Sequence, residues 1–119
     1  MTYIDGFVLA VPTAQRDAYR QHAESVLPLF KRHGALRMVE TWGSDVPDGT
    51  HTSFPMAVKL KPDETVVFSW IVWPDRETRD KAWAAMPGDP EMNSSMEVPF
   101  DGKRMIYGGF EPLLEADLA

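Results

Sequence analysis

The chain contains no cysteine among its 119 residues. Disulfides, cysteine-based zinc sites and thiol nucleophiles are therefore excluded, because each needs a cysteine sulfur. Long apolar runs are absent too. The stretch 7–11 is too short for a membrane span or a signal core, Asp5 interrupts the apolar sequence before it, and no basic leader precedes it. The sequence predicts a protein without a membrane anchor, and the cytoplasm is its default location.

Positive charge is also scarce. Twelve Lys and Arg stand against 18 Asp and Glu, which gives a formal net charge of −6. The basic residues are scattered and form no run longer than two. Nucleic-acid binding depends on cations that neutralise phosphates, so we expect no nucleic acid among the partners. The segment 103–110, KRMIYGGF, loosely resembles the aromatic motif of RNA-recognition domains, but it falls on the fourth predicted strand rather than the third.

Metal ligands and cofactor motifs are few. Of the three histidines, His22 and His33 share a helical pattern, while His51 stands alone in a loop. At 1.5 Å rise per residue the first two would lie about 16 Å apart. One metal ion needs both nitrogens at about 2 Å, so the pair cannot form a site alone. No glycine-rich phosphate loop or serine nucleophile motif is present. We predict no metal and no cofactor.

The sequence does contain an alternation of strand and helix patterns, over a length typical of a single domain covering residues 1–119. Runs of β-branched and aromatic residues that end at proline predict strands, and apolar residues three to four positions apart predict helices. Gly34 stands where the first helix should end, and Asp75 is the expected N-cap of the second. The predicted elements are strands over 3–11, 35–43, 65–73 and 103–110, and helices over 14–33 and 76–86.

This βαββαβ order predicts an α+β, ferredoxin-like fold. The right-handed crossover rule and antiparallel pairing of the middle strands give a four-stranded antiparallel sheet in the order 4-1-3-2, with both helices on one face. The connection 44–61 is too long for a hairpin turn, and Thr52 or Ser53 is expected to cap a short helix within it. Another helical turn is expected after residue 88, with Asp89 as its N-cap and Pro90 at its first position.

The predicted strand over 65–73 has almost no polar position, although two helices can cover only one face of a sheet. A near-continuous apolar run is typical of a strand that is buried on both faces. If ~500 Å² of apolar surface stayed exposed, the forfeited burial would be about 12 kcal/mol. That figure rivals the entire stability of a small domain, about 5–15 kcal/mol. The sequence therefore predicts that a second copy covers the free face in a two-fold homodimer.

Four segments in order carry a resemblance to a known family. They read YIDGFVLAVP (3–12), HGALRMVETWGSDVPDG (33–49), DETVVFSWIVWP (63–74) and DGKRMIYGGFE (101–111). Together they resemble the YbaA-like family of small bacterial proteins, a domain of unknown function in the dimeric α+β-barrel superfamily. The resemblance implies the ferredoxin-like fold and a homodimer whose sheets face each other as a barrel. It brings no catalytic residues, and the superfamily's cofactor-free monooxygenases and haem proteins are related only by fold-level analogy.

Two carboxylates stand inside the predicted strands, Asp5 and Glu40. A carboxylate buried beside aromatic residues has a raised pKa and can accept a proton. The predicted strand order separates the two by one strand, roughly 9–10 Å. The other interpretation is that each carboxylate pairs with a nearby arginine, Arg37 or Arg104, or with a backbone amide at the end of the sheet.

The strand patterns also indicate a ligand pocket. Polar contacts are expected from the two strand carboxylates, and the predicted lining residues are aromatic: Trp42, Phe68, Trp70 and Tyr107. Three interpretations stay open. The protein binds a small, partly aromatic or carbonyl-containing molecule between sheet and helices, or it is a cofactor-independent enzyme, monooxygenase- or isomerase-like, with Asp5 or Glu40 as base. In the third interpretation, the protein has a structural or interaction role and binds no ligand. A cavity of mixed polarity favours the first two, and a fully packed interior favours the third.

Overall fold

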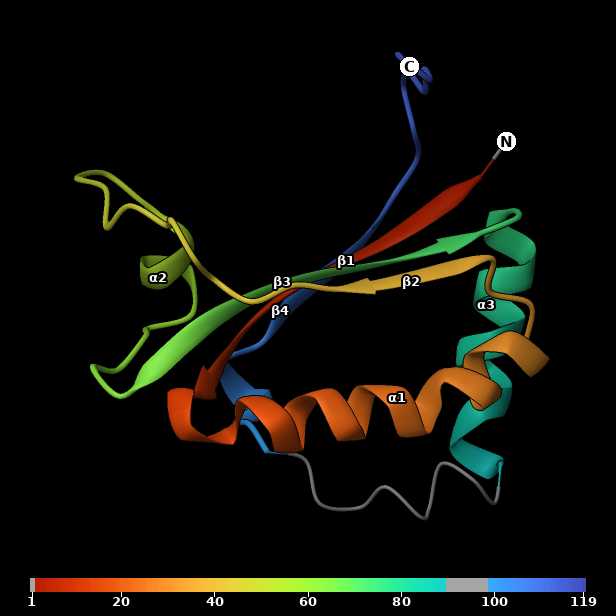
Figure 1. Cartoon of the computed structure of the whole chain (residues 1–119). Coiled ribbons are helices and arrows are strands. Elements are labelled where there is room, and N and C mark those ends of the chain that lie inside the picture. The colour runs from red at the N-terminus through yellow and green to blue at the C-terminus, as the bar shows by residue number, and fades with distance from the viewer. Residues whose placement is uncertain (1, 90–98) are drawn as a thin grey trace.

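A computed structural model describes residues 2–89 and 99–119 and shows a four-stranded antiparallel sheet with helices beneath it (Figure 1). The strands are β1 (Tyr3–Pro12), β2 (Arg37–Glu40), β3 (Glu64–Trp73) and β4 (Ile106–Phe110). The helices are α1 (Arg16–Arg32), α2 (Phe54–Ala57) and α3 (Arg76–Ala85). The strand order is β2-β3-β1-β4. Both this order and the succession of elements confirm the predicted ferredoxin-like fold.

The helices begin and end where local chemistry places them. Asp75 caps α3 by accepting a hydrogen bond from the backbone N–H of Thr78 at 2.7 Å, and Ser53 caps α2 by accepting one from Met56 at 3.1 Å. Gly34 follows α1 with a φ of 99°, in the region that glycine adopts most easily. These three helix boundaries confirm the sequence prediction. No helix in the described part of the chain is long and apolar enough to cross a membrane.

The edge strand β2 is shorter than the predicted 35–43, but its pairing with β3 extends beyond its assigned residues. The backbone N–H of Leu36 donates to the carbonyl of Val72 at 2.8 Å, and that of Gly43 donates to Val66 at 2.9 Å. The regular ladder between these outer bonds covers only four residues. The chain therefore follows β3 over most of the predicted length.

The last strand, β4, begins three residues later than predicted. Residues 102–104 form a 3₁₀ turn, and Asp101 caps it by accepting the backbone N–H of Lys103 at 3.0 Å. The chain joins the sheet only at Ile106, opposite Val8. The helical turn predicted to start at Asp89 and Pro90 falls on residues 90–98 and lies outside the described residues.

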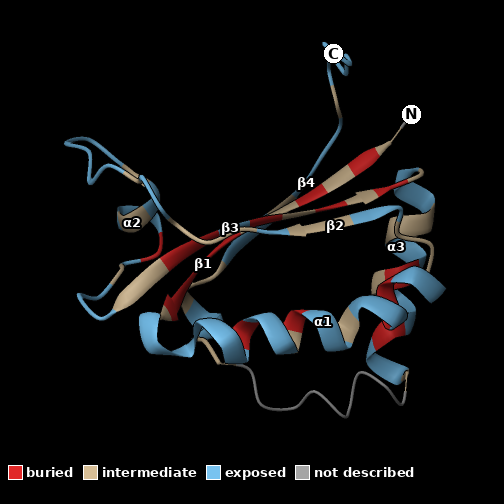
Figure 2. Ribbon diagram, viewed as in Figure 1, coloured by how far each residue is buried: buried red, intermediate tan, exposed pale blue. Residues whose placement is uncertain are grey.

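The register between β1 and β3 decides which side chains meet the helices. Phe7 pairs with Ser69, so both point to the side of α1 and α3, which we call the helix side. The burial pattern shows the main core between the sheet and these helices (Figure 2). Its fully buried members include Leu9, Val11, Leu29, Val67, Trp73 and Met86.

The chain itself covers one end of the opposite face. The connection 44–61, which includes α2 and which we call the arm, folds over this end (Figure 1). The cluster buried there comprises Val8, Ala10, Val58 and Val66, with Val46 and Leu60 packed against it. At this end the long connection therefore supplies apolar cover from the same chain, and the second copy predicted from the sequence is left the rest of the face.

The rest of that face is apolar and exposed, and we call it the open face. Its side chains include Phe68, Ile106 and Phe110, which are 44%, 45% and 60% exposed. The ring of Phe68 packs against Phe54 of the arm at a centroid distance of 5.8 Å and against Trp70 at 5.4 Å. The open face thus forms an aromatic platform beside the arm.

The C-terminal tail, residues 111–119, rises from the sheet on the side away from α1 (Figure 1). Three leucines in it, Leu113, Leu114 and Leu118, are 101%, 86% and 96% exposed. Thr2 donates a hydrogen bond to Glu115 at 2.6 Å, so the tail touches the start of β1. Its leucines nevertheless contact water rather than this chain.

Candidate functional site

A cavity of about 240 Å³ lies between α1 and the helix side of the sheet. Apolar side chains from β1, α1, β3, α3 and the segment before β4 form most of its wall. They include Phe7, Leu9, Phe30, Ile71, Trp83 and Phe100. Aromatic rings meet edge to face in this wall, with Phe30 and Trp83 at a centroid distance of 5.6 Å. The cavity therefore presents flat apolar surfaces at several angles.

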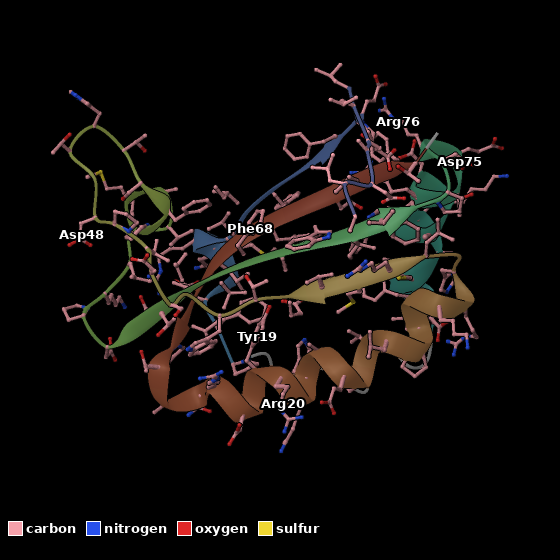
Figure 3. All side chains as sticks on the ribbon, turned by 45° about the horizontal axis from the view of Figure 1, so that its top comes forward. Tyr19, Arg20, Asp48, Phe68, Asp75 and Arg76 are labelled. Atoms are coloured by element: carbon pink, nitrogen blue, oxygen red, sulfur yellow. The ribbon has the colours of Figure 1, made fainter. Side chains whose placement is uncertain are left out.

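One end of the cavity is polar. The phenol of Tyr19 on α1 donates a hydrogen bond to Oε1 of Glu40 on β2 at 2.6 Å. Ser69 on β3 is the ladder partner of Glu40 and also lines the cavity. Tyr19 and Ser69 are buried, whereas Glu40 is exposed at the edge of the sheet. Figure 3 shows Tyr19 between α1 and the sheet, while its neighbour Arg20 points away from it.

The surroundings shift the proton affinities at this end. Glu40 is exposed on one side, but protein atoms around its carboxyl group exclude water and raise its pKa. Hydrogen bonds with Tyr19 and Ser69 oppose this rise. Burial also raises the pKa of the Tyr19 phenol, with the charge of Glu40 as the second cause. Burial lowers the pKa of His22, which lines the same cavity. Each shift favours the neutral form of its group.

Asp5, one of the two predicted catalytic candidates, is 3% exposed and bonded through both oxygens. Its Oδ1 accepts hydrogen bonds from Nε and Nη2 of Arg79 at 3.0 and 2.8 Å. Its Oδ2 accepts from the indole N–H groups of Trp73 at 2.9 Å and Trp83 at 2.8 Å. The arginine partner is thus neither of the two that the sequence suggested. Asp5 connects β1, β3 and α3 as a structural ion pair.

The structure does not bring the four predicted aromatic residues together. Phe68 and Trp70 lie on the open face, away from Glu40, because the β1–β3 register turns Ser69 to the helix side. Figure 3 shows Phe68 on the sheet. Tyr107 lies on the helix side and lines a neighbouring hollow with Asp5. That hollow shares Phe7, Trp83 and Met105 with the cavity.

Trp42 lies on the other flank of the polar end. It lines a groove together with Tyr19, Glu40 and Arg16, whose guanidinium lies 5.5 Å from the centre of the indole ring. Glu40 therefore stands where this groove and the cavity adjoin. Of the predicted site residues, only Glu40 lines the cavity itself.

Sequence reasoning missed Tyr19 and Ser69. Tyr19 precedes Ala23 by one helical turn on the apolar side of α1, and this spacing marks it as facing the sheet. Ser69 is the one polar residue between Val66 and Trp73, and both its neighbours are aromatic. A single polar position in an otherwise apolar strand was the available signal for the polar end of the site.

The histidines lie in three separate environments. His22 lines the cavity, His33 has its Nε2 at 3.2 Å from Oδ2 of Asp89, and His51 is exposed in the arm. Within residues 2–89 and 99–119, no group of three or more histidine, aspartate or glutamate side chains is placed to hold a metal ion.

The architecture and the cavity define a ferredoxin-like α+β protein with a small apolar site under its sheet. Residues 2–102 match the family described as "Protein of unknown function (DUF1428)", and the chain belongs to this family. It is 58% identical to the uncharacterized protein YbaA of Escherichia coli K12, over 97% of this chain and 99% of that protein. The identity and coverage are the same for YbaA of Shigella flexneri. The YbaA-like resemblance is therefore confirmed.

Solved structures share the fold at low sequence identity. Rv0793 from Mycobacterium tuberculosis superposes with a TM-score of 0.57 at 14% identity, over 98% of this chain and all of that one. SnoaB from Streptomyces nogalater, a cofactor-independent oxygenase, gives 0.54 at 16% identity, over 96% and 93% of the two chains. A dimeric ferredoxin-like protein from an uncultured marine organism gives 0.57 at 8% identity, over 98% and 99%. At these identities the likeness establishes the fold alone.

Proposed function

We propose that the protein binds a small, partly aromatic molecule in the cavity between α1 and the sheet, and that it does so as a homodimer. The cavity itself supports the first half. It is open to the outside, so a small molecule can enter it, and its volume of about 240 Å³ is lined mostly by apolar side chains. Binding sites for small molecules are typically concave and mostly apolar with a few polar groups, which favours ligand binding over a ligand-free role.

A cavity-filling variant tests this function. Ala23 on α1 lines the cavity, and Ala23→Leu places a larger side chain in it. Ala18→Leu makes the same change on the exposed side of the same helix and serves as the matched control. Fragment binding is followed by ligand-observed NMR, and native mass spectrometry of freshly purified protein reveals a retained molecule. We expect the affinity to fall at least about tenfold in the first variant only, equivalent to about 1.4 kcal/mol. Equal affinity in both variants would place binding elsewhere.

A second candidate function is proton-transfer catalysis with Glu40 as the base. Its raised pKa brings a carboxyl group closer to neutral pH, where a general base works best. Asp5 is unsuited, because four donor groups hold its oxygens. SnoaB, which shares the fold, is named as a cofactor-independent oxygenase, and this adds an analogy of fold.

The test for catalysis uses a cyclic ketone that binds in the cavity. In D₂O, a base beside the bound ketone exchanges a hydrogen on the carbon next to the carbonyl, and NMR follows the loss of that signal. We expect exchange with the wild type and none above background with Glu40→Gln. Equal exchange rates for the two proteins would exclude Glu40 as the base.

The open face supports the homodimer. Phe68, Ile106 and Phe110 would lose their contact with water if a second sheet packed on them, and burying each large apolar side chain contributes about 1.5–3 kcal/mol. The backbone of the arm and that of the C-terminal tail lie on the side of the sheet away from α1 (Figure 1), and the leucines of the tail are exposed. Two proteins of this fold are described as dimeric ferredoxin-like proteins. A two-fold pair is the simplest closed assembly that covers such a face.

Adjacent residues of β4 provide a matched pair of variants for the homodimer. Ile106 points to the open face, and Tyr107, which is 73% exposed, points to the helix side. Sedimentation equilibrium should show a weakened dimer for Ile106→Lys and an unchanged one for Tyr107→Lys. A stable, folded 13 kDa monomer of the wild type at micromolar concentration would contradict the homodimer.

A further inference from the structure

The charges around the cavity restrict what it can bind. Among the described residues that line it, none is Lys or Arg, and the titratable ones are Tyr19, His22 and Glu40. The first two favour their neutral forms, since burial raises the pKa of Tyr19 and lowers that of His22. Among the described lining residues, Glu40 is the one whose side chain is ordinarily ionised at neutral pH. The nearest arginines, Arg16 and Arg20, line the adjoining groove and not the cavity.

The polar end offers acceptors rather than donors. The Tyr19 proton is already committed to Oε1 of Glu40 in a 2.6 Å hydrogen bond. An ionised carboxylate has about four acceptor positions on its two oxygens, and a phenol oxygen that donates can still accept. Glu40 and Tyr19 therefore keep free lone pairs at this end. A ligand meets them best with an O–H or N–H group of its own.

An anionic ligand would fit poorly. A carboxylate or phosphate group inside the cavity would lie beside Glu40, while the nearest arginines, Arg16 and Arg20, line the adjoining groove rather than the cavity. Like charges at short range repel strongly in a partly dehydrated site. The net charge of −6 also disfavours the approach of anions. A neutral molecule meets neither obstacle.

The rest of the cavity suits one aromatic ring. Phe7 and Phe30 contact Trp83 with centroid distances of 6.5 and 5.6 Å, and Met38 and Met105 add polarizable sulfur to the wall. An apolar protein cavity of about 150 Å³ is large enough for benzene. The larger volume of about 240 Å³ leaves room for one ring with small substituents.

We propose that the ligand is a neutral, single-ring aromatic molecule with one hydroxyl or N–H group, of which a simple phenol is the type, and that this group donates to Glu40. The aromatic body lies between the rings of α1, α3 and β1, and the cavity rejects aromatic carboxylates. This inference rests on the proposed binding function and names its ligand class.

Three probes of nearly equal size test the ligand class against the full-length wild type at neutral pH. They are p-cresol, its O-methyl ether 4-methylanisole, and p-toluate, and NMR titration gives each dissociation constant. A hydrogen bond to a charged acceptor contributes about 1.5–3 kcal/mol, so p-cresol should bind at least about tenfold more tightly than the ether. No saturable binding of p-toluate is expected.

Two glutamates of equal charge provide the matched variants. Glu40→Gln should weaken p-cresol about tenfold and allow p-toluate to bind, since the repelling charge is gone. Glu24→Gln removes a carboxylate from the exposed side of α1 and should leave all three affinities unchanged. If Glu40→Gln fails to fold, the three probes on the wild type alone still decide the question.

Each outcome has a distinct meaning. Equal affinities for p-cresol and 4-methylanisole, or tight binding of p-toluate, would overturn the ligand class while the proposed binding function stood. If none of the three rings bound, nor did toluene, both proposals would fail. A tenfold preference for p-cresol that survives Glu40→Gln would also overturn the assignment of Glu40 as the acceptor.

Discussion

Arg79 on α3 holds Asp5 on β1 through two nitrogens that lie 3.0 and 2.8 Å from the same carboxylate oxygen. The second oxygen accepts from the indoles of Trp73 and Trp83, so one buried carboxylate satisfies three donor side chains. The arrangement fixes α3 against the sheet beside the hollow that adjoins the cavity. It indicates that Asp5 stabilises the fold and that Glu40 alone of the two predicted carboxylates is available to a ligand.

The first prediction concerns this buried pair. Asp5→Ala leaves the Arg79 charge and two indole N–H groups without their acceptor, and breaking a buried ion pair costs about 3–5 kcal/mol. Asp80→Ala removes an exposed carboxylate that also binds Arg79, and should cost at most about 1 kcal/mol. Urea unfolding measures both values. A loss for Asp5→Ala as small as that for Asp80→Ala would show that the pair contributes little to the fold.

The second prediction is a pH dependence from Glu40. Because its folded pKa is raised above the ordinary 4.5, the folded state binds more protons than the unfolded chain in this range. This contribution to stability is fully present below pH 4.5 and is lost as the pH rises through the folded pKa. We expect Glu40→Gln to flatten this part of the curve of unfolding free energy against pH. Glu24→Gln should keep the wild-type slope, and an unchanged slope in Glu40→Gln would contradict the prediction.

The third prediction compares the two neighbouring glycines of β4. A Cβ on Gly109 would stand 2.8 Å from a ring carbon of Tyr3 and 2.9 Å from Nη2 of Arg79, whereas one on Gly108 would meet only the Phe110 ring at 3.5 Å. Overpacking of this kind costs about 1–3 kcal/mol, so Gly109→Ala should be clearly destabilising and Gly108→Ala nearly neutral. Thermal melting of the two variants tests this, and equal melting temperatures would contradict it.

The fourth prediction concerns the arm. Val58 is 1% exposed and packs on Val8, Ala10 and Val66 of the sheet. Val58→Ala removes two buried carbon atoms and should cost about 1–3 kcal/mol. Asp48→Ala, at the exposed tip of the arm, is the control and should change little.

Replacing residues 44–61 by a short glycine turn should lower the stability and also weaken the dimer. If the truncated chain kept its stability and its dimer affinity, the arm would be an inert insertion.

The fifth prediction concerns the tail. Leu113, Leu114 and Leu118 are exposed in the single chain, so we expect a second copy to cover them. Removal of residues 111–119 should raise the dimer dissociation constant by about tenfold or more, the equivalent of about 1.4 kcal/mol. Asp117→Ala keeps the leucines and should not change it. Sedimentation equilibrium decides between the two outcomes, and an unchanged constant after truncation would exclude the tail from the interface.

Much of the fold could be predicted because local signals agree with each other. Pro12, Pro74, Asp75 and Gly34 mark where elements begin or end. The length of the arm already excludes a hairpin turn, and Ser53, which caps α2, is among the predicted caps. What the arm covers depends on contacts between Val58 and residues far away in the chain, which no local pattern encodes.

The site was harder to predict for a physical reason. In β3 both faces are apolar, so the sequence alone does not say whether Phe68 or Ser69 points to the helices. The hydrogen-bonded register with β1 settles this, since it pairs Phe7 with Ser69 and turns Phe68 to the open face. The prediction placed Phe68 and Trp70 beside Glu40, and the register separates them from it. A shift of one residue in a strand exchanges every side chain between its two faces.

The lengths of the strands have a consequence for solubility. The two outer strands, β2 and β4, span four and five residues, while the inner strands β1 and β3 span ten each. A sheet grows into fibres by adding strands at its edges, and a short edge strand such as β4 offers few free backbone groups for this. The exposed apolar side chains of the open face lie on a face of the sheet instead, and in the proposed homodimer the stacking of two copies would end in a closed pair. Association through this apolar face is therefore complete at two copies and does not continue into a polymer.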